Sequence, residues 1–279
     1  MLILLPPSEG KTAARRGGPL DLGRLGSPSL TASRERMLAA LVDLCSGPDT
    51  DLAATTLGLG PGQRDLVRRN AGLREAPTAR ADRVYSGVLY DALGFGTLSP
   101  AAKRRAATRV AVTSSLFGLV APGDRIPAYR LSGDATLPGL GTVAGFWRNH
   151  LDPAVREHVG SGLLVDLRSG TYAGFWRPAP DLARRVVSVR VLHEHQGTRK
   201  VVSHFNKATK GRLVRAVLED SANPRTPAAF ADLLRDLGWK VEEGSPLGPP
   251  TSAPQKSAQK SAPQKSAEGT RLDVVVDEV

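Results

Sequence analysis

The chain has 279 residues, of which 41% are hydrophobic and 23% are charged, and its formal net charge is +11. This composition is typical of a globular protein with one or two domains. No apolar run approaches the roughly 18 residues that span a bilayer, and the single cysteine, Cys45, cannot form an internal disulfide. The short apolar opening lacks the flanks of a signal peptide, so we expect a cytoplasmic protein without a membrane partner.

The first predicted element is a buried strand at residues 1–5, which the pair Pro6-Pro7 ends. Residues 12–29 are rich in glycine, proline and arginine and predict a loop. Further strands are expected at residues 109–114, 163–167, 186–192 and 200–205. Helices are expected at about residues 31–44, 63–71, 207–220 and 226–237. This alternation predicts an α/β fold, a mixed sheet flanked by helices.

The end of the chain has a different composition. Residues 239–242 and 271–276 are strand-like, and the tract between them contains Gln-Lys-Ser-Ala three times. Such a tract has too little apolar surface to offset the entropy lost on ordering. We therefore predict a disordered insertion at residues 244–269 within a C-terminal hairpin, and a single domain formed by residues 1–243 together with 270–279.

The excess positive charge lies entirely on residues 1–243, because the acids and bases after them balance. A basic protein of this kind favours a polyanionic partner such as nucleic acid, whose counterions it releases. A bias toward arginine can also arise from the base composition of a genome. Charge alone therefore leaves both interpretations open.

The segment Ser8-Glu9-Gly10-Lys11-Thr12 follows the first strand and has the Gly-Lys-Thr ending of a phosphate-binding loop. The leading glycine of that loop is replaced by Leu5, so the full pattern is absent. A lysine at the end of an α/β strand nevertheless suits a ligand crevice, and we retain Lys11 as a candidate anion contact.

Residues 57–62 (Leu-Gly-Leu-Gly-Pro-Gly) precede a basic helix with Arg64, Arg68 and Arg69. The pattern resembles the hairpin of a helix-hairpin-helix element, in which glycine N–H groups approach a DNA phosphate. A glycine-rich turn without a ligand has the same pattern. His193 and His195 would share one face of a strand, but no third ligand lies nearby, and we predict neither a metal site nor a cofactor.

The most specific basic segment is residues 205–215. Asn206 is expected to cap a helix, so that Lys207 and Lys210 lie at its positive end, where phosphate binds readily. A solvated basic helix face is the alternative.

Several of these segments carry a family resemblance. They are the opening Met-Leu-Ile-Leu-Leu-Pro-Pro-Ser-Glu-Gly-Lys-Thr, Val84-Tyr85-Ser86-Gly87, the stretch from Ser115 to Leu131, Phe146-Trp147, residues 166–172 (Asp-Leu-Arg-Ser-Gly-Thr-Tyr) and the helix at 207–215. In this order and over residues 1–243, the chain is similar to the YaaA family of peroxide-stress proteins. Two positions depart from better-known members: Thr171 replaces an acidic residue, and the opening differs from the Ser-Pro-Ala-Lys type.

The resemblance implies a single α/β domain with a positively charged cleft, DNA binding, and a role in limiting iron-dependent oxidative damage. We expect the DNA contacts to be sequence-independent and electrostatic. The candidate phosphate contacts are Lys11, Arg130, Lys207, Lys210, Arg212 and Arg215.

The rival hypothesis is an enzyme that acts on a small phosphorylated or nucleotide-like substrate in the same cleft. The candidate pocket residues are Ser8, Glu9, Asp124, Tyr129, Asp166 and Tyr172. A narrow pocket with shifted pKa values would favour the enzyme, whereas a broad open groove would favour DNA.

Overall fold

The computed structural model describes residues 1–168, 170–195, 198–244 and 269–277. Its main sheet has the strand order β11-β12-β9-β8-β1-β3-β4, and β10 pairs with β9. These strands are β1 (Leu2–Leu5), β3 (Val110–Ser114), β4 (Gly118–Val120), β8 (Leu164–Asp166), β9 (Val186–His195), β10 (Thr198–Lys200), β11 (Lys240–Glu243) and β12 (Thr270–Asp277). The central five strands run parallel, and β4, β10 and β11 are antiparallel to their neighbours. The predicted mixed sheet is confirmed.

The central strands are buried on both faces. Every residue of β1 and of β3 is buried, which explains why their sequences read as continuous apolar runs instead of alternating ones. Two short pairs lie outside the main sheet: β2 (Ala79–Arg80) with β5 (Arg125–Ile126), and β6 (Thr136–Leu137) with β7 (Gly141–Thr142).

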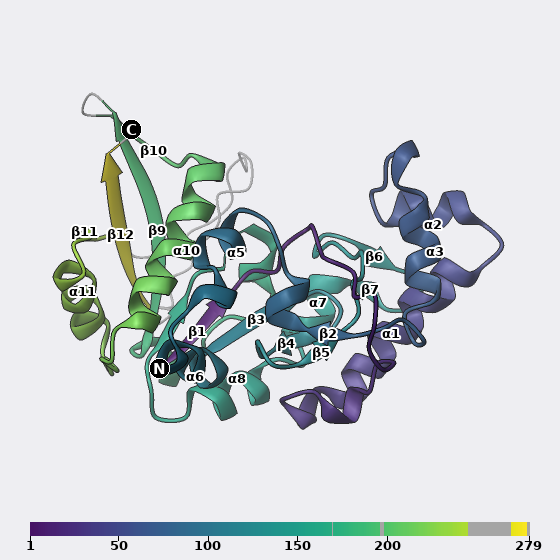
Figure 1. Cartoon of the computed structure of the whole chain (residues 1–279), viewed down its shortest axis with the longest axis horizontal. Coiled ribbons are helices and arrows are strands. Elements are labelled where there is room, and N and C mark those ends of the chain that lie inside the picture. The colour runs from purple at the N-terminus through teal and green to yellow at the C-terminus, as the bar shows by residue number, and fades with distance from the viewer. Residues whose placement is uncertain (169, 196–197, 245–268, 278–279) are drawn as a thin grey trace, which may run out of the picture.

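Helices pack against the sheet, and further helices lie beyond one of its sides (Figure 1). The α-helices are α1 (Thr31–Ser46), α2 (Thr50–Thr56), α3 (Asp65–Ala71), α4 (Ala81–Val84), α5 (Val88–Leu93), α6 (Pro100–Arg109), α7 (Val143–Arg148), α8 (Asp152–Val159), α9 (Pro180–Ala183), α10 (Ser203–Glu219) and α11 (Pro227–Asp236). Short 3-10 helices occur at η1 (Leu22–Arg24), η2 (Pro28–Leu30), η3 (Pro61–Gln63), η4 (Phe95–Thr97) and η5 (Gly170–Phe175). Helices α1, α2 and α3 lie at the opposite end of the molecule from β11 and β12. In the described part of the chain, no helix is long and apolar enough to cross a membrane.

The strands that follow β1 in the chain are added first on one side of it in the sheet and later on the other side. From β1 the chain reaches β3 on one side, and β8, β9 and β12 fill the opposite side. The neighbours β1 and β8 therefore mark the point where the strand order reverses. In open α/β sheets, the crevice outside the carboxyl ends at such a point is the usual ligand site.

The predicted strand at residues 200–205 is wrong beyond Lys200, because α10 begins at Ser203. Asn206 is also not the cap: the N-cap is Val202, and no side chain caps this helix. The β-branched pair Val201-Val202 favours a strand locally, but packing of α10 against α5 and the sheet overrides that preference.

The C-terminal strands β11 and β12 pair antiparallel, and Gly244 donates a hydrogen bond to the carbonyl of Arg271. The predicted disordered insertion falls almost entirely on residues 245–268, which lie outside the described residues.

Candidate functional site

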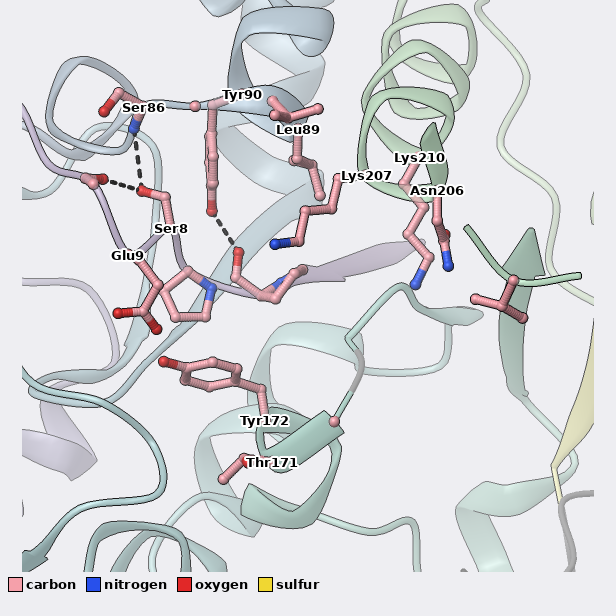
Figure 2. Close-up of a pocket in the computed structure, with 17 residues that line it drawn as sticks. Ser8, Glu9, Ser86, Leu89, Tyr90, Thr171, Tyr172, Asn206, Lys207 and Lys210 are labelled. Atoms are coloured by element: carbon pink, nitrogen blue, oxygen red, sulfur yellow. Dashed lines mark hydrogen bonds between the residues drawn. The ribbon is translucent and has the colours of Figure 1, made fainter. Parts of the chain in front are cut away.

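A cavity of about 550 Å³ lies at the carboxyl ends of β1 and β8. Its walls come from residues 6–10 after β1, residues 86–90 at the start of α5, residues 170–172 of η5, and Val201 together with α10. Figure 2 shows Lys207, Lys210 and Asn206 entering from α10, opposite Glu9 and Tyr172. The cavity therefore occupies the position that the sheet topology favours for a ligand.

One glycine sets how closely α10 approaches α5. A β-carbon on Gly211 would lie 2.2 Å from the carbonyl oxygen of Leu89 and 2.9 Å from Cβ of Ala92. A glycine inside a helix costs stability relative to alanine. The glycine at position 211 is explained by the close backbone contact, which leaves no room for a β-carbon. This contact brings the lysines of α10 against the α5 wall of the cavity.

Lys210 is a buried cation that lines the cavity. Only 5% of the residue is exposed, and its ammonium group donates to the carbonyl of Leu167 at 2.8 Å. Burial lowers the pKa of Lys210 to about 8, although Asp166 opposes the shift. Lys207 is exposed and also lines the cavity. The structure therefore brings together these two predicted phosphate contacts.

Asp166 does not face the cavity as a free carboxylate. Its oxygens accept hydrogen bonds from Nε and Nη2 of Arg168 at 2.9 and 2.7 Å, and the Arg168 side chain is 1% exposed. Burial alone would raise the pKa of Asp166, but the charge and hydrogen bonds of Arg168 hold it below its usual value. The pair fixes the loop after β8 and leaves Lys207 and Lys210 as the cations that line the cavity.

Glu9 and Arg130 meet at the other end of the cavity. The two side chains form an ion pair, and Glu9 is the member of the pair that lines the cavity. The backbone N–H and C=O of Arg130 are held by the side chain of Asn70, at 2.9 and 2.7 Å. Asn70 is fully buried in α3. Asn70 and Arg130 therefore link α3 to Glu9 at the cavity wall.

Lys11 lies behind the cavity wall rather than in its lining. Its ammonium group donates to the carbonyl of Ser8 at 2.8 Å and lies 4.1 Å from the ring centre of Tyr129. Burial lowers the pKa of Lys11 to about 7; Glu9 opposes this shift, and Arg130 adds to it. The ammonium group of Lys11 thus stabilises the segment after β1 that carries Glu9.

Three of the predicted pocket residues have structural contacts of their own. Ser8 accepts the N–H of Ser86 at 3.1 Å and lines the cavity. The hydroxyl of Tyr129 lies 2.8 Å from Oγ of Ser114, inside the core. Asp124 lies outside the cavity and accepts the N–H groups of Gly26 and Ala121 at 3.0 and 2.9 Å. Asp124 therefore stabilises the backbone around Gly26 and Ala121.

The two remaining phosphate candidates lie further along α10 and outside the cavity lining. Arg212 is exposed. Arg215 donates to the carbonyls of Leu93, Gly94 and Thr97, at 3.0, 3.2 and 3.0 Å. Those carbonyls belong to the last residue of α5 and to the turn that follows it, so the guanidinium caps the C-terminal end of that helix.

Tyr90 was not singled out from the sequence, and Asn206 was expected only to cap a helix. Tyr90 lines the cavity and donates to the carbonyl of Pro6 at 2.7 Å. Asn206 lines it with a buried Oδ1 that has no hydrogen-bond partner within the described part of the chain. Neither residue carries a sequence signal for the cavity, because each acquires its position there from a contact between distant segments. An internal glycine in the helical pattern, Gly211, was the detectable sign of close packing.

The glycine-rich segment after α2 forms a hairpin between two helices. Thr50–Thr56 and Asp65–Ala71 are the helices, and η3 lies in the connection. A β-carbon added at Gly58, Gly60 or Gly62 would have nothing within 4 Å. The backbone of this hairpin is therefore open on its outer side, as a helix-hairpin-helix element requires.

Comparisons with known proteins agree over nearly the whole described domain. A family profile described as peroxide stress protein YaaA matches residues 1–244. A UPF0246 protein of Streptomyces coelicolor is 50% identical over 246 residues, which is 88% of this chain and 94% of the relative. A UPF0246 protein of Corynebacterium efficiens is 44% identical over 87% of this chain and 95% of the relative. An uncharacterized protein of Campylobacter jejuni is 25% identical over 77% of this chain and 83% of its own length.

Proposed function

The chain belongs to the YaaA family of peroxide stress proteins, and we propose that it acts in the peroxide response by binding DNA along the phosphate backbone, without sequence preference. The observation that carries the proposal is the open hairpin between α2 and α3. Its three glycines place no side chain over the backbone, so a phosphate oxygen can approach the hairpin closely. The N–H groups of Gly58 and Gly60 already donate to the carbonyl of Thr55 and to Oε1 of Gln63, at 3.0 and 3.3 Å.

Basic side chains follow the hairpin directly. Arg68 and Arg69 are exposed on α3, and Arg64 is exposed while paired with Asp51 at 2.6 Å. In Figure 1 the hairpin helices lie at the right of the view and α10 lies at the left. Exposed Lys207 and Arg212 on α10 are the further phosphate contacts that we propose, as parts of a positively charged cleft. Lys11, Arg130, Lys210 and Arg215 are instead held by contacts inside the protein.

The role in limiting iron-dependent oxidative damage follows from the family and from the DNA contact together. A protein that covers DNA shields the polymer that iron and peroxide damage. No described residue is assigned to iron in this proposal.

The decisive experiment places a carboxylate on the hairpin. Gly60→Glu adds a side chain where nothing lies within 4 Å, and the backbone φ of −74° suits any residue. We expect duplex affinity, measured by fluorescence anisotropy in a salt series, to fall at least tenfold. The log–log salt slope should become shallower by about 0.9 for each phosphate that the variant no longer neutralises.

The matched control is Gly96→Glu, which adds the same charge at another glycine with nothing within 4 Å. It should keep wild-type affinity. Equal binding by the wild type and Gly60→Glu would contradict the hairpin as the DNA contact. In cells, a strain that carries Gly60→Glu should be as peroxide-sensitive as a deletion strain.

A different observation supports an enzyme acting on a small phosphorylated or nucleotide-like substrate. The cavity has the size of small-molecule sites, polar groups converge in it, and the pKa of Lys210 is lowered. Incubation with a panel of nucleotides and sugar phosphates, followed by chromatography, tests this function. If no member of the panel changes in the presence of the protein and no turnover depends on Lys210, the enzyme function is excluded for those substrates.

A further inference from the structure

The cavity has two chemically different ends. In Figure 2, Lys210 and Asn206 lie at one end, Glu9 and Tyr172 lie at the other, and Lys207 reaches between them. The lining at one end is cationic, and at the other it offers a carboxylate. A ligand that satisfies both ends must itself be bipolar.

The cationic end has no ion-pair partner among the described residues. Within the described residues, neither Lys207 nor Lys210 forms an ion pair, and the carboxylate nearest in sequence to Leu167, that of Asp166, is bound by Arg168 through both oxygens. Lys210 uses one of its three donors on a carbonyl. A cation that is 5% exposed and faces a cavity is costly unless an anion joins it.

The middle of the cavity is apolar and held rigid. Pro6, Pro7 and Leu89 contribute aliphatic surface, and Tyr90 contributes an aromatic ring. The Tyr90 hydroxyl is fixed on the carbonyl of Pro6, and its ring stacks on Tyr85 at 5.4 Å. Such walls suit a sugar and a planar base.

The far end accepts hydrogen bonds. Arg130 engages Oε2 of Glu9, and among the described residues no donor engages Oε1. The Tyr172 hydroxyl stays protonated, because burial raises the pKa of Tyr172. A carboxylate oxygen beside a phenol favours a ligand edge that carries N–H groups.

From these three parts we infer that the cavity binds one nucleotide unit, with its phosphate at Lys207 and Lys210 and its base directed toward Glu9. A phosphate ion takes up the volume of only a few water molecules, at about 30 Å³ each, so phosphate alone would leave most of the 550 Å³ cavity unfilled. The inference draws on the proposed function only for nucleic acid as one source of the nucleotide. The other source is a free mononucleotide.

The experiment titrates the protein with three probes by calorimetry: deoxyadenosine monophosphate, inorganic phosphate, and a short duplex. We expect the mononucleotide to bind saturably and at least tenfold more tightly than phosphate. Lys210→Met and Lys207→Met should each weaken nucleotide binding tenfold or more. The control is Lys103→Met, which removes a lysine that also donates to a carbonyl, at 2.9 Å, but lies outside the cavity.

Nucleotide binding that equals phosphate binding would overturn the inference in favour of a simple anion site. Duplex binding without mononucleotide binding would also overturn it and would leave the hairpin contact of the DNA proposal intact. Mononucleotide binding without duplex binding would support the inference and contradict the DNA proposal. If Lys210→Met fails to fold, the exposed Lys207→Met and a Glu9→Gln variant decide, since Gln is expected to lower nucleotide affinity without changing phosphate affinity.

Discussion

Replacing Gly211 by alanine should destabilise this protein, although the same change inside a helix usually stabilises. Alanine gains about 1 kcal/mol over glycine from helix propensity. Here the new Cβ would lie 2.2 Å from the carbonyl oxygen of Leu89 and 3.0 Å from the N of Leu93. Both atoms belong to the backbone of α5, so the helices must separate by roughly 1 Å or more to reach an ordinary contact distance.

Overpacking of this kind costs about 1–3 kcal/mol, and a clash with backbone lies at the upper end. After subtraction of the propensity gain, the free energy of unfolding should fall by about 2 kcal/mol, which corresponds to about 4–8 °C in Tm. Urea and thermal unfolding measure both quantities. The control is Gly96→Ala, with nothing within 4 Å, which should change stability by less than about 0.5 kcal/mol. A Gly211→Ala variant as stable as the wild type would refute the close-packing argument.

Three further predictions concern buried charges. The pKa values of Lys11 and Lys210, about 7 and about 8, lie below the usual 10.5. Between about pH 7 and 10 the unfolded chain therefore binds more protons than the folded protein, so these lysines make the free energy of unfolding rise with pH in that window. Lys210→Met should make this rise smaller, as measured by urea unfolding at several pH values across the window. Arg34 is fully buried and donates to three backbone carbonyls; Arg34→Met should lower the free energy of unfolding by roughly 2–4 kcal/mol, and a decrease below 0.5 kcal/mol would speak against these bonds. Asp166→Asn leaves Arg168 buried without its counter-charge and should cost about 3–5 kcal/mol, whereas an unchanged urea midpoint would contradict the pairing.

Much of the fold was predictable because local pattern reflects burial. The apolar runs at residues 2–5, 110–114 and 164–166 are central strands of the sheet. The expected helix near the end begins at Pro227, and Thr226 caps it by accepting the N–H of Ala229. Each of these features depends on neighbours within a few residues, so the sequence carries the information directly.

The strand expected at residues 200–205 failed for the opposite reason. Val201 and Val202 have strand propensity, but the register of β9 with β12 and the packing of α10 decide where the sheet ends. Local propensity is a weak term beside the burial of a helix face. Helix α10 therefore begins at Ser203, one turn before the expected start at Lys207.

Fold class, family and the excess of positive charge could all be inferred from the amino-acid order alone. Which charged groups line a cavity, and which are held by internal contacts, emerged with the folded structure. Glu9 meets Arg130 across 121 positions, and Arg215 reaches Thr97 across 118. Partners so far apart come together only when the sheet topology is formed, and nothing in the neighbourhood of either residue specifies the other. Burial and hydrogen bonding then set the charge that each group carries, which is why candidates of the same residue type took different roles.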